Sequence, residues 1–444
     1  MKPIAEFNTK LPKLNLNETK VLKLLVEAAK LIVPIYELQE NSKILGANFY
    51  PKGVSKASIE KEAEKNPEIL SPYTVVEKQG SKLIAIPYHV KYAELLQPVV
   101  NRLLEAAKLT ENKEFGKRLE IQAKALLDGT YDETVISWMS MKQYILDINI
   151  GPVERYDDKL FFAKTSYQAW VGVMDGVNST RVNTYKEIIL SSRRKVLMAS
   201  EKVDYYDKVQ TRVDNVVIFA GLIARAQFIG VNLPNNVTLM EKYGSEITIF
   251  KEISDFRFKT YVWPSFEKIF SKEFKKLFTT NGVSEGHLYA VVLHELAHTF
   301  LRYRNSEKNL QDLFPIIDEL SASVMGIKVC GSLLLKDILT QKQLESIMVA
   351  FTARCFSMAL WEKDDPAKYH YTMGATIFLN YLFETGAIKE AGGISWPNFT
   401  KMFVSLDELA SVLERLLSQG NRADAEAFIR RYGDSKKLKK LTTL

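Results

Sequence analysis

The chain has 444 residues, of which 46% are hydrophobic and 25% charged, with 14 Pro and 21 Gly. This ordinary composition excludes collagen-like, coiled-coil and wholly disordered chains, and the length suits two or three domains. The 60 Lys and Arg against 53 Asp and Glu give a net charge of +7, too small an excess to indicate a nucleic-acid groove.

The two cysteines, Cys330 and Cys355, exclude a disulfide framework and a Cys-rich zinc site. No apolar segment follows the N-terminal residues, so we expect no signal peptide. The longest clean apolar run, Val216–Ala224, has nine residues, whereas a membrane helix needs about 18 or more. We therefore expect a cytoplasmic protein with no membrane or nucleic-acid partner, and leave the oligomeric state open.

In the first part of the chain, apolar residues at helical spacing predict a helix within 14–40. Two short β-like runs, Tyr73–Glu77 and Leu83–Tyr88, flank a Gly-containing loop and predict a hairpin. Residues 89–127 show the pattern of a long amphipathic helix that breaks near residues 110–112.

Further along, Asp147–Val173 mixes aromatic residues with Gly-Pro and acidic turns, and we expect strand and loop there. Tyr185–Lys208 is helical in pattern, Asn215–Phe228 is apolar and partly β-branched, and Gly230–Asn236 predicts an Asn-rich loop. From about Ser265 to the end, the chain is almost entirely helical in pattern.

The segment from His294 to His298 fits the pattern H-E-x-x-H inside a predicted buried helix, Ser284–Arg302, with Ser284 near its N-cap. Positions i and i+4 share one helix face, so His294 and His298 can both reach one Zn²⁺. Glu295 lies beside that face and can take a proton from zinc-activated water. We therefore predict one catalytic zinc ion per chain.

A catalytic zinc site needs a third protein ligand. The best candidate is Glu319, on a second helix that Pro315 can start after a short loop. Asp318, the residue before Glu319, points about 100° away from it on the same helix. It is our second candidate for the third ligand and our first candidate for a hydrogen-bond partner of a ligand histidine. His287 is about 16 Å from His298 along the helix axis, so we interpret it as a helix-start or surface residue.

Several further segments, together with these motifs, resemble the dipeptidyl peptidase III family of zinc peptidases, and more closely its shorter bacterial and archaeal members. The resemblance covers most of the chain in one collinear order. Its segments are Asn48–Pro51, Ser71–Val76, Asp147–Tyr156, Asn232–Asn235, His294–His298, Asp318–Ala322, Tyr369–His370 and Asn380–Leu382.

The resemblance implies an α+β, mostly helical fold with two lobes around a wide cleft. A mixed lobe with a small sheet or barrel would comprise residues 1–167 and 216–261. A helical zinc-binding lobe would comprise 168–215 and 262–444. The implied activity is release of dipeptides from the N-termini of short peptides.

By position, the resemblance assigns Asp147 to the substrate's α-amino group, and Asn232 and Asn235 to its backbone. It assigns His370 to oxyanion stabilisation. Three positions depart from the family pattern. Asn149 stands at the catalytic Tyr, Ser323 at a carboxylate and Gly374 at an Arg.

These departures keep two alternatives open. One is a peptide-binding protein that retains zinc with weak or no turnover. The other is an endopeptidase of another two-His, one-Glu family.

Overall fold

The computed structural model describes residues 3–196, 208–234, 236–301, 303, 305–362, 368–396, 398–436 and 438. The chain divides into two compact units. The first unit is Met1–Gly176, Val213–Phe228 and Leu233–Tyr243, and the second is Val177–Arg212, Ile229–Asn232 and Gly244–Leu444.

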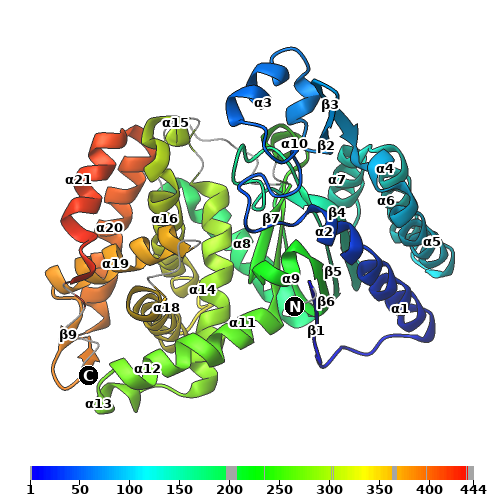
Figure 1. Ribbon diagram of the computed structural model, residues 1–444. Helices are drawn as coiled ribbons and strands as arrows, with labels where there is room; N and C mark the ends of the chain where they lie inside the picture. Colours follow the sequence, from blue (N-terminus) through cyan, green and yellow to red (C-terminus); the bar gives the residue numbers. More distant parts are fainter. Residues whose placement is uncertain are drawn as a thin grey trace. The chain divides into compact units, whose positions relative to one another are not determined.

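The predicted mostly helical α+β fold with two parts is confirmed (Figure 1). The boundaries of the units differ from the predicted ones. Residues 168–176 and 213–215 belong to the first unit, because strands β5 and β6 continue through them. Residues 229–232 and 244–261 belong to the second. The cleft between the lobes stays a prediction.

The first unit is a sheet covered by helices, with a separate hairpin. The predicted hairpin is confirmed as β2 paired with β3, and the helix break near residues 110–112 separates α5 from α6. The predicted helix in 14–40 is two helices that meet at Ile32. The elements are β1 (Ile4–Glu6), α1 (Leu16–Leu31), α2 (Val33–Gln39), α3 (Lys56–Ala63), η1 (Pro67–Leu70), β2 (Thr74–Gln79), β3 (Lys82–Pro87), α4 (Tyr88–Lys91), α5 (Ala93–Leu109), α6 (Lys113–Asp128), α7 (Tyr131–Ser140), β4 (Leu146–Glu154), β5 (Ser166–Met174), α9 (Leu222–Ala226), α10 (Val237–Tyr243) and most of β6 (Gln210–Gly221).

The main sheet has the order β4-β5-β6-β8-β7, with β1 paired to β6. Strands β4, β5 and β6 are antiparallel, with Ile148 opposite Val171 and Asn149 opposite Trp170. Because side chains alternate along a strand, one face presents Ile148 and Val171 to a core shared with α1 and α5. The opposite face carries Asp147 and Asn149, so the predicted site residue Asp147 lies on the face away from this core, together with Asn149.

The second unit is helical around a central pair, α14 and α16, with α18 beside α14 (Figure 1). Its elements are α8 (Gly176–Val196), β7 (Gly230–Leu233), β8 (Glu246–Phe250), α11 (Lys251–Arg257), η3 (Phe258–Val262), α12 (Trp263–Ile269), α13 (Lys272–Lys275), α14 (Thr280–Phe300), α15 (Ser306–Leu310), η4 (Gln311–Leu313), α16 (Phe314–Lys328), α17 (Cys330–Leu334), α18 (Gln341–Trp361), α19 (Tyr369–Glu384), β9 (Lys389–Glu390), β10 (Ile394–Ser395), α20 (Phe399–Gln419) and α21 (Arg422–Tyr432).

Two predictions for this unit need correction. The segment predicted as an Asn-rich loop begins as strand β7, because its apolar side chains Val231 and Leu233 are buried on one side. The predicted helix around the H-E-x-x-H motif begins at Thr280, four residues before Ser284. Its N-cap is Thr279, whose hydroxyl accepts a hydrogen bond from the amide of Gly282 at 3.1 Å.

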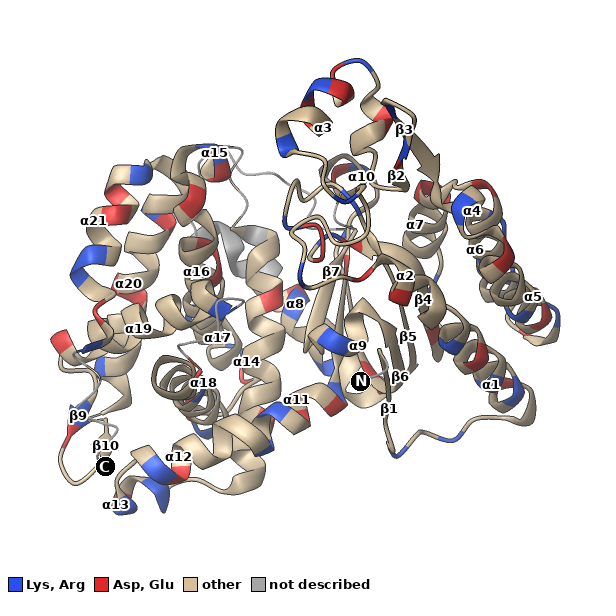
Figure 2. Ribbon diagram, in the orientation of Figure 1, with Lys and Arg blue, Asp and Glu red and all other residues tan. Residues whose placement is uncertain are grey.

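Helix α18 is the only helix among the described residues that is long and apolar enough to cross a membrane by length and composition. In its most apolar stretch 78% of the residues are buried inside the protein, so its apolar side chains pack within the core of the unit. Helices such as α5 and α21 carry both basic and acidic residues (Figure 2).

Candidate metal centre

Helix α14 carries the two histidines of the motif on one face. Its other faces bury Leu293, Leu296 and Ala297 in the core of the unit, and this burial fixes the rotation of the helix. Since residues four apart share a helix face, His294 and His298 point the same way. Their rings lie 4.7 Å apart between centroids and nearly at right angles.

Helix α16 supplies the third member of the group. It follows the short elements α15 and η4, and Pro315 occupies its first turn as predicted. Burial of Ile316, Ile317 and Leu320 sets its rotation. Glu319 then faces α14.

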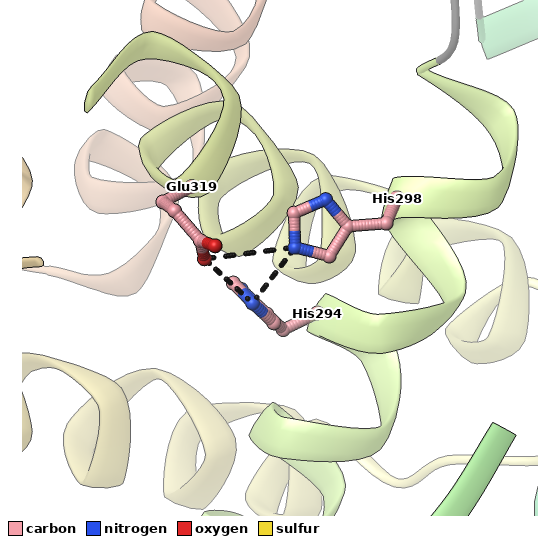
Figure 3. A group of neighbouring side chains, drawn as sticks. All are labelled: His294, His298 and Glu319. Carbon is pink, nitrogen blue, oxygen red and sulfur yellow. Dashed lines mark hydrogen bonds and ion pairs between the residues drawn. The ribbon is translucent and has the colours of Figure 1, made fainter. Parts of the chain in front are cut away.

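His294, His298 and Glu319 converge (Figure 3). The two Nε2 atoms are 3.1 Å apart, and Glu319 Oε2 is 3.2 Å from Nε2 of His294 and 3.6 Å from that of His298. A tetrahedral zinc ion with ligands at 2.0–2.1 Å has ligand–ligand separations of about 3.3 Å. The three atoms therefore fit three corners of a zinc tetrahedron, and the group could hold a metal ion.

The other ring nitrogen of each histidine has its own partner on α16. His294 Nδ1 lies 2.9 Å from the hydroxyl of Ser323, and His298 Nδ1 lies 3.3 Å from Asp318 Oδ2. Of these two contacts, that of His294 is a hydrogen bond and that of His298 is an ion pair. Partners on the second ring nitrogen of a ligand histidine typically fix the tautomer and aim the free nitrogen at the metal. Asp318 thus lies beside His298, and its role as the partner of a ligand histidine stays a prediction.

The charged forms of His298 and Glu319 stabilise each other without a metal ion. Burial lowers the pKa of His298, but the carboxylates of Asp318 and Glu319 outweigh burial and hold that pKa well above its usual range. Burial raises the pKa of Glu319, but His298 and His294 outweigh it and hold that pKa well below its usual range. Metal binding would displace the proton that His298 holds, as expected of a histidine–carboxylate ligand set.

Glu295, the predicted general base, faces strand β7. A Cβ added to Gly230 would lie 3.6 Å from Glu295 Cγ, so the side chain passes close to this strand. Glu295 makes no hydrogen bond or ion pair within the described part of the chain. Its carboxylate is available to a bound water or substrate.

Asn232 shares the Gly230 face of β7, because residues two apart on a strand point the same way. Its side-chain oxygen is buried without a hydrogen-bond partner among the described residues. Asn235, the other residue predicted to bind the peptide backbone, lies outside the described residues. The structure thus places Asn232 on the strand that passes beside Glu295.

His370 is the second residue of α19 and is half-buried, with its ring centroid 4.1 Å from that of Tyr371. Burial lowers its pKa, and the Glu319 carboxylate opposes that shift. His370 is thus a neutral imidazole near neutral pH and can donate one hydrogen bond. A side chain at Gly374 would meet Leu320 of α16 at ordinary contact distance.

The interpretation of His287 as a helix-start or surface residue is wrong. It is 3% exposed and lies inside α14, because the helix begins earlier than predicted. Burial, with smaller contributions from Arg354 and Arg257, lowers its pKa to about 3. It is not part of the three-residue metal group.

Asp147 lies in the first unit and is buried. Its Oδ1 accepts a hydrogen bond from Arg118 Nη1 at 2.6 Å, and Arg118 Nη2 donates to the carbonyl of Ile148 at 2.5 Å. The rings of Phe115 and Trp138 each lie 5.9 Å from the guanidinium carbon. Sequence reasoning missed Arg118, because nothing in its local pattern links it to a strand 29 residues later.

The same face of the sheet carries two more polar residues that have unsatisfied atoms. The side-chain oxygen of Asn149 and both amide atoms of Gln168 are buried with no hydrogen-bond partner among the described residues. Gln168 was not predicted. In the β4–β5–β6 register it lies between Gly151 and Gly221. This placement follows from the strand pairing and cannot be read from the local sequence.

No protein-family profile matches the chain. A curated relative is Nudix hydrolase 3 of Arabidopsis thaliana, 23% identical over 402 residues, which are 89% of this chain and 51% of the relative. The chain thus spans about half the length of that relative.

Two solved structures match nearly the whole chain. Dipeptidyl peptidase III from Caldithrix abyssi has a TM-score of 0.88 and 24% identity, with coverage of 96% of this chain and 92% of that one. This chain has the dipeptidyl peptidase III fold. The enzyme from Corallococcus sp. strain EGB has a TM-score of 0.77 and 22% identity over 99% of this chain and 94% of its own. The dipeptidyl peptidase III resemblance predicted from the motifs is therefore confirmed for the fold.

Proposed function

We propose that the chain is a zinc-dependent exopeptidase that releases dipeptides from the N-termini of short peptides. The observation that carries the proposal is the triangle of His294, His298 and Glu319, in which each histidine is oriented by a partner on α16. The dipeptidyl peptidase III fold supports the reaction class. A cytoplasmic location stays part of the proposal.

The zinc ion held by the triangle would polarise the scissile carbonyl and acidify water. Glu295 would accept the water's proton and pass it to the leaving amine. Its lack of a partner among the described residues supports this role, since a carboxylate engaged in an ion pair is a weaker base. His370 would donate a hydrogen bond to the developing oxyanion, which its neutral state allows.

The peptide would lie extended along β7. This strand ends the sheet order, so one of its edges has no strand partner within the described residues. Extended peptides commonly add to such an edge through main-chain hydrogen bonds. The amide of Asn232 can both donate to and accept from a peptide backbone, and Asn235 would extend this contact. Asp147 would hold the α-amino group.

A peptide-binding protein with zinc but little turnover is the second candidate. The observation that favours it is Asn149, at the position of the family's catalytic Tyr, with its side-chain oxygen buried and unsatisfied among the described residues. An amide N–H is a weaker, less acidic hydrogen-bond donor to an oxyanion than a phenol O–H. Binding of short peptides without product release would favour this candidate.

The decisive experiment identifies products from matched peptides. The protein, loaded with one zinc ion per chain, is incubated with a tetrapeptide carrying a free N-terminus and with its N-acetylated form, and the products are identified by mass spectrometry. We expect dipeptides from the free peptide only. Zinc-loaded Glu295→Gln is the matched control and should release almost none. Equal cleavage of both peptides would show an endopeptidase and refute the proposal.

A further inference from the structure

Helices α14 and α16 meet at Gly326. A Cβ added to Gly326 would lie 2.7 Å from the carbonyl oxygen of Leu293 and 3.0 Å from the amide nitrogen of His294. Real Cβ atoms do not approach backbone atoms so closely, so any other residue here would force the helices apart. The absence of a side chain lets the two backbones touch, and the contact falls on a residue of the metal group.

Ser323 lies one turn before Gly326 on the same helix. Its hydroxyl is only one bond beyond Cβ, yet it reaches His294 Nδ1 at 2.9 Å. So short a side chain can bridge two helices only where their backbones are close. The reach of Ser323 therefore depends on the contact at Gly326.

We propose that Ser323 and Gly326 are positioning residues of the metal centre, and that the close helix approach at Gly326 lets the Ser323 hydroxyl orient the His294 ring. The inference rests on the metal site of the proposed function. His294 Nδ1–H donates to Ser323, which leaves Nε2 as the free ligand atom aimed at His298 and Glu319.

The two histidines are oriented by different chemistry. His298 has a carboxylate partner, Asp318, whereas His294 has a neutral hydroxyl. A hydroxyl places the ring without adding negative charge. Among the described residues, Glu319 and Asp318 are the carboxylates that pair with the histidines, and their two charges balance a divalent ion. Ser323 thus orients the His294 ring without changing the charge of the site. Removal of its hydroxyl therefore tests the effect of ring orientation.

The experiment measures metal affinity, not activity. Zinc affinity is determined by competition with a chromogenic chelator, and the visible absorption of the Co²⁺-loaded protein reports ligand geometry. Ser323→Ala should bind zinc about tenfold more weakly, the lower end of the usual effect of such partners, with an altered Co²⁺ spectrum. Ser323→Thr keeps the hydroxyl and should restore both.

Ser321→Ala is the matched control. Ser321 is a buried serine of α16 whose hydroxyl donates to the carbonyl of Ile317 at 2.5 Å and does not touch the metal group. This variant should keep wild-type zinc affinity. Equal affinities of Ser323→Ala, Ser321→Ala and the wild type would overturn the inference.

A second pair of variants tests the helix contact. Gly326→Ala should weaken zinc binding at least tenfold. Gly286→Ala makes the same kind of clash, 2.4 Å from the carbonyl oxygen of Ser346 on α18, but two turns away from His294. It should lose stability while keeping zinc affinity, and equal losses of affinity in both variants would overturn the role of Gly326.

If Gly326→Ala does not fold, the Ser323 and Ser321 variants decide the inference alone. A wild-type protein that binds neither zinc nor Co²⁺ would refute the proposed function itself. A wild type that binds zinc tightly, together with unaffected Ser323 variants, would refute only the inference.

Discussion

Replacing Asp147 with Asn should destabilise the first unit strongly. The Arg118 and Asp147 side chains are 7% and 2% exposed, with their charged atoms 2.6 Å apart. Asn removes the negative charge but leaves the guanidinium buried between aromatic rings, where it still donates to the Ile148 carbonyl. Breaking one side of a buried pair costs about 3–5 kcal/mol. Urea unfolding followed by circular dichroism should detect this loss.

The double variant Arg118→Met/Asp147→Leu separates stability from recognition. Replacing both members of a buried pair with apolar residues is often neutral or stabilising, so the double variant should recover most of the lost stability. If Asp147 holds the substrate amine, the same variant should lose the preference for a free over an acetylated tetrapeptide in inhibition assays.

Two results would refute this reasoning. If Asp147→Asn unfolds at the same urea concentration as the wild type, the ion pair does not contribute as its burial implies. If the stable double variant still prefers the free amine, Asp147 is a structural residue and another group must bind the N-terminus.

Three further predictions concern the second unit. Zinc-loaded Glu295→Gln should lose about 10²–10⁴-fold in turnover because Gln cannot accept the proton; wild-type turnover would remove Glu295 from the mechanism. Glu319→Ala should lose its zinc by elemental analysis, and full retention would make Asp318 the candidate ligand. Because the pKa of His287 is about 3 in the folded protein and about 6.5 when unfolded, the unfolded chain binds this proton first as pH falls. Stability should therefore fall below pH 6.5 by up to about 1.4 kcal/mol per pH unit. His287→Phe should flatten that slope in urea titrations between pH 6.5 and 4, and an unchanged slope would contradict the argument.

The metal group could be predicted from the sequence because its determinants are local. Helical periodicity alone places His294 and His298 on one face, and Pro315 marks the start of the helix that carries Glu319. The β2–β3 hairpin and the break between α5 and α6 were predictable for the same reason. In each case the signal lies within a few residues of the feature.

The rest depends on contacts between segments far apart in the chain. The pairing of Arg118 with Asp147 can be recognised only from the structure, in which α6 lies against β4. The segment of strand β7 was predicted to be a loop, because Gly230, Asn232 and the following Pro234 favour turns. Its burial depends on the neighbouring strand β8, which is distant in sequence. Ser323 was recognised as a departure from the family pattern, but its contact with His294 requires the distance between two helices.

One face of α16 unites the parts of the metal centre. Glu319, Ser323 and Gly326 stand at positions i, i+4 and i+7, the spacing of a single helix stripe. The first provides a ligand, the second orients His294 and the third brings the helix against α14. Insertion of one residue between Glu319 and Gly326 would rotate all later positions of the helix by about 100°. The ligand and the positioning residues would then no longer share one face of α16. The register of α16, set by Pro315 and its buried apolar residues, is therefore as important to the centre as its ligands.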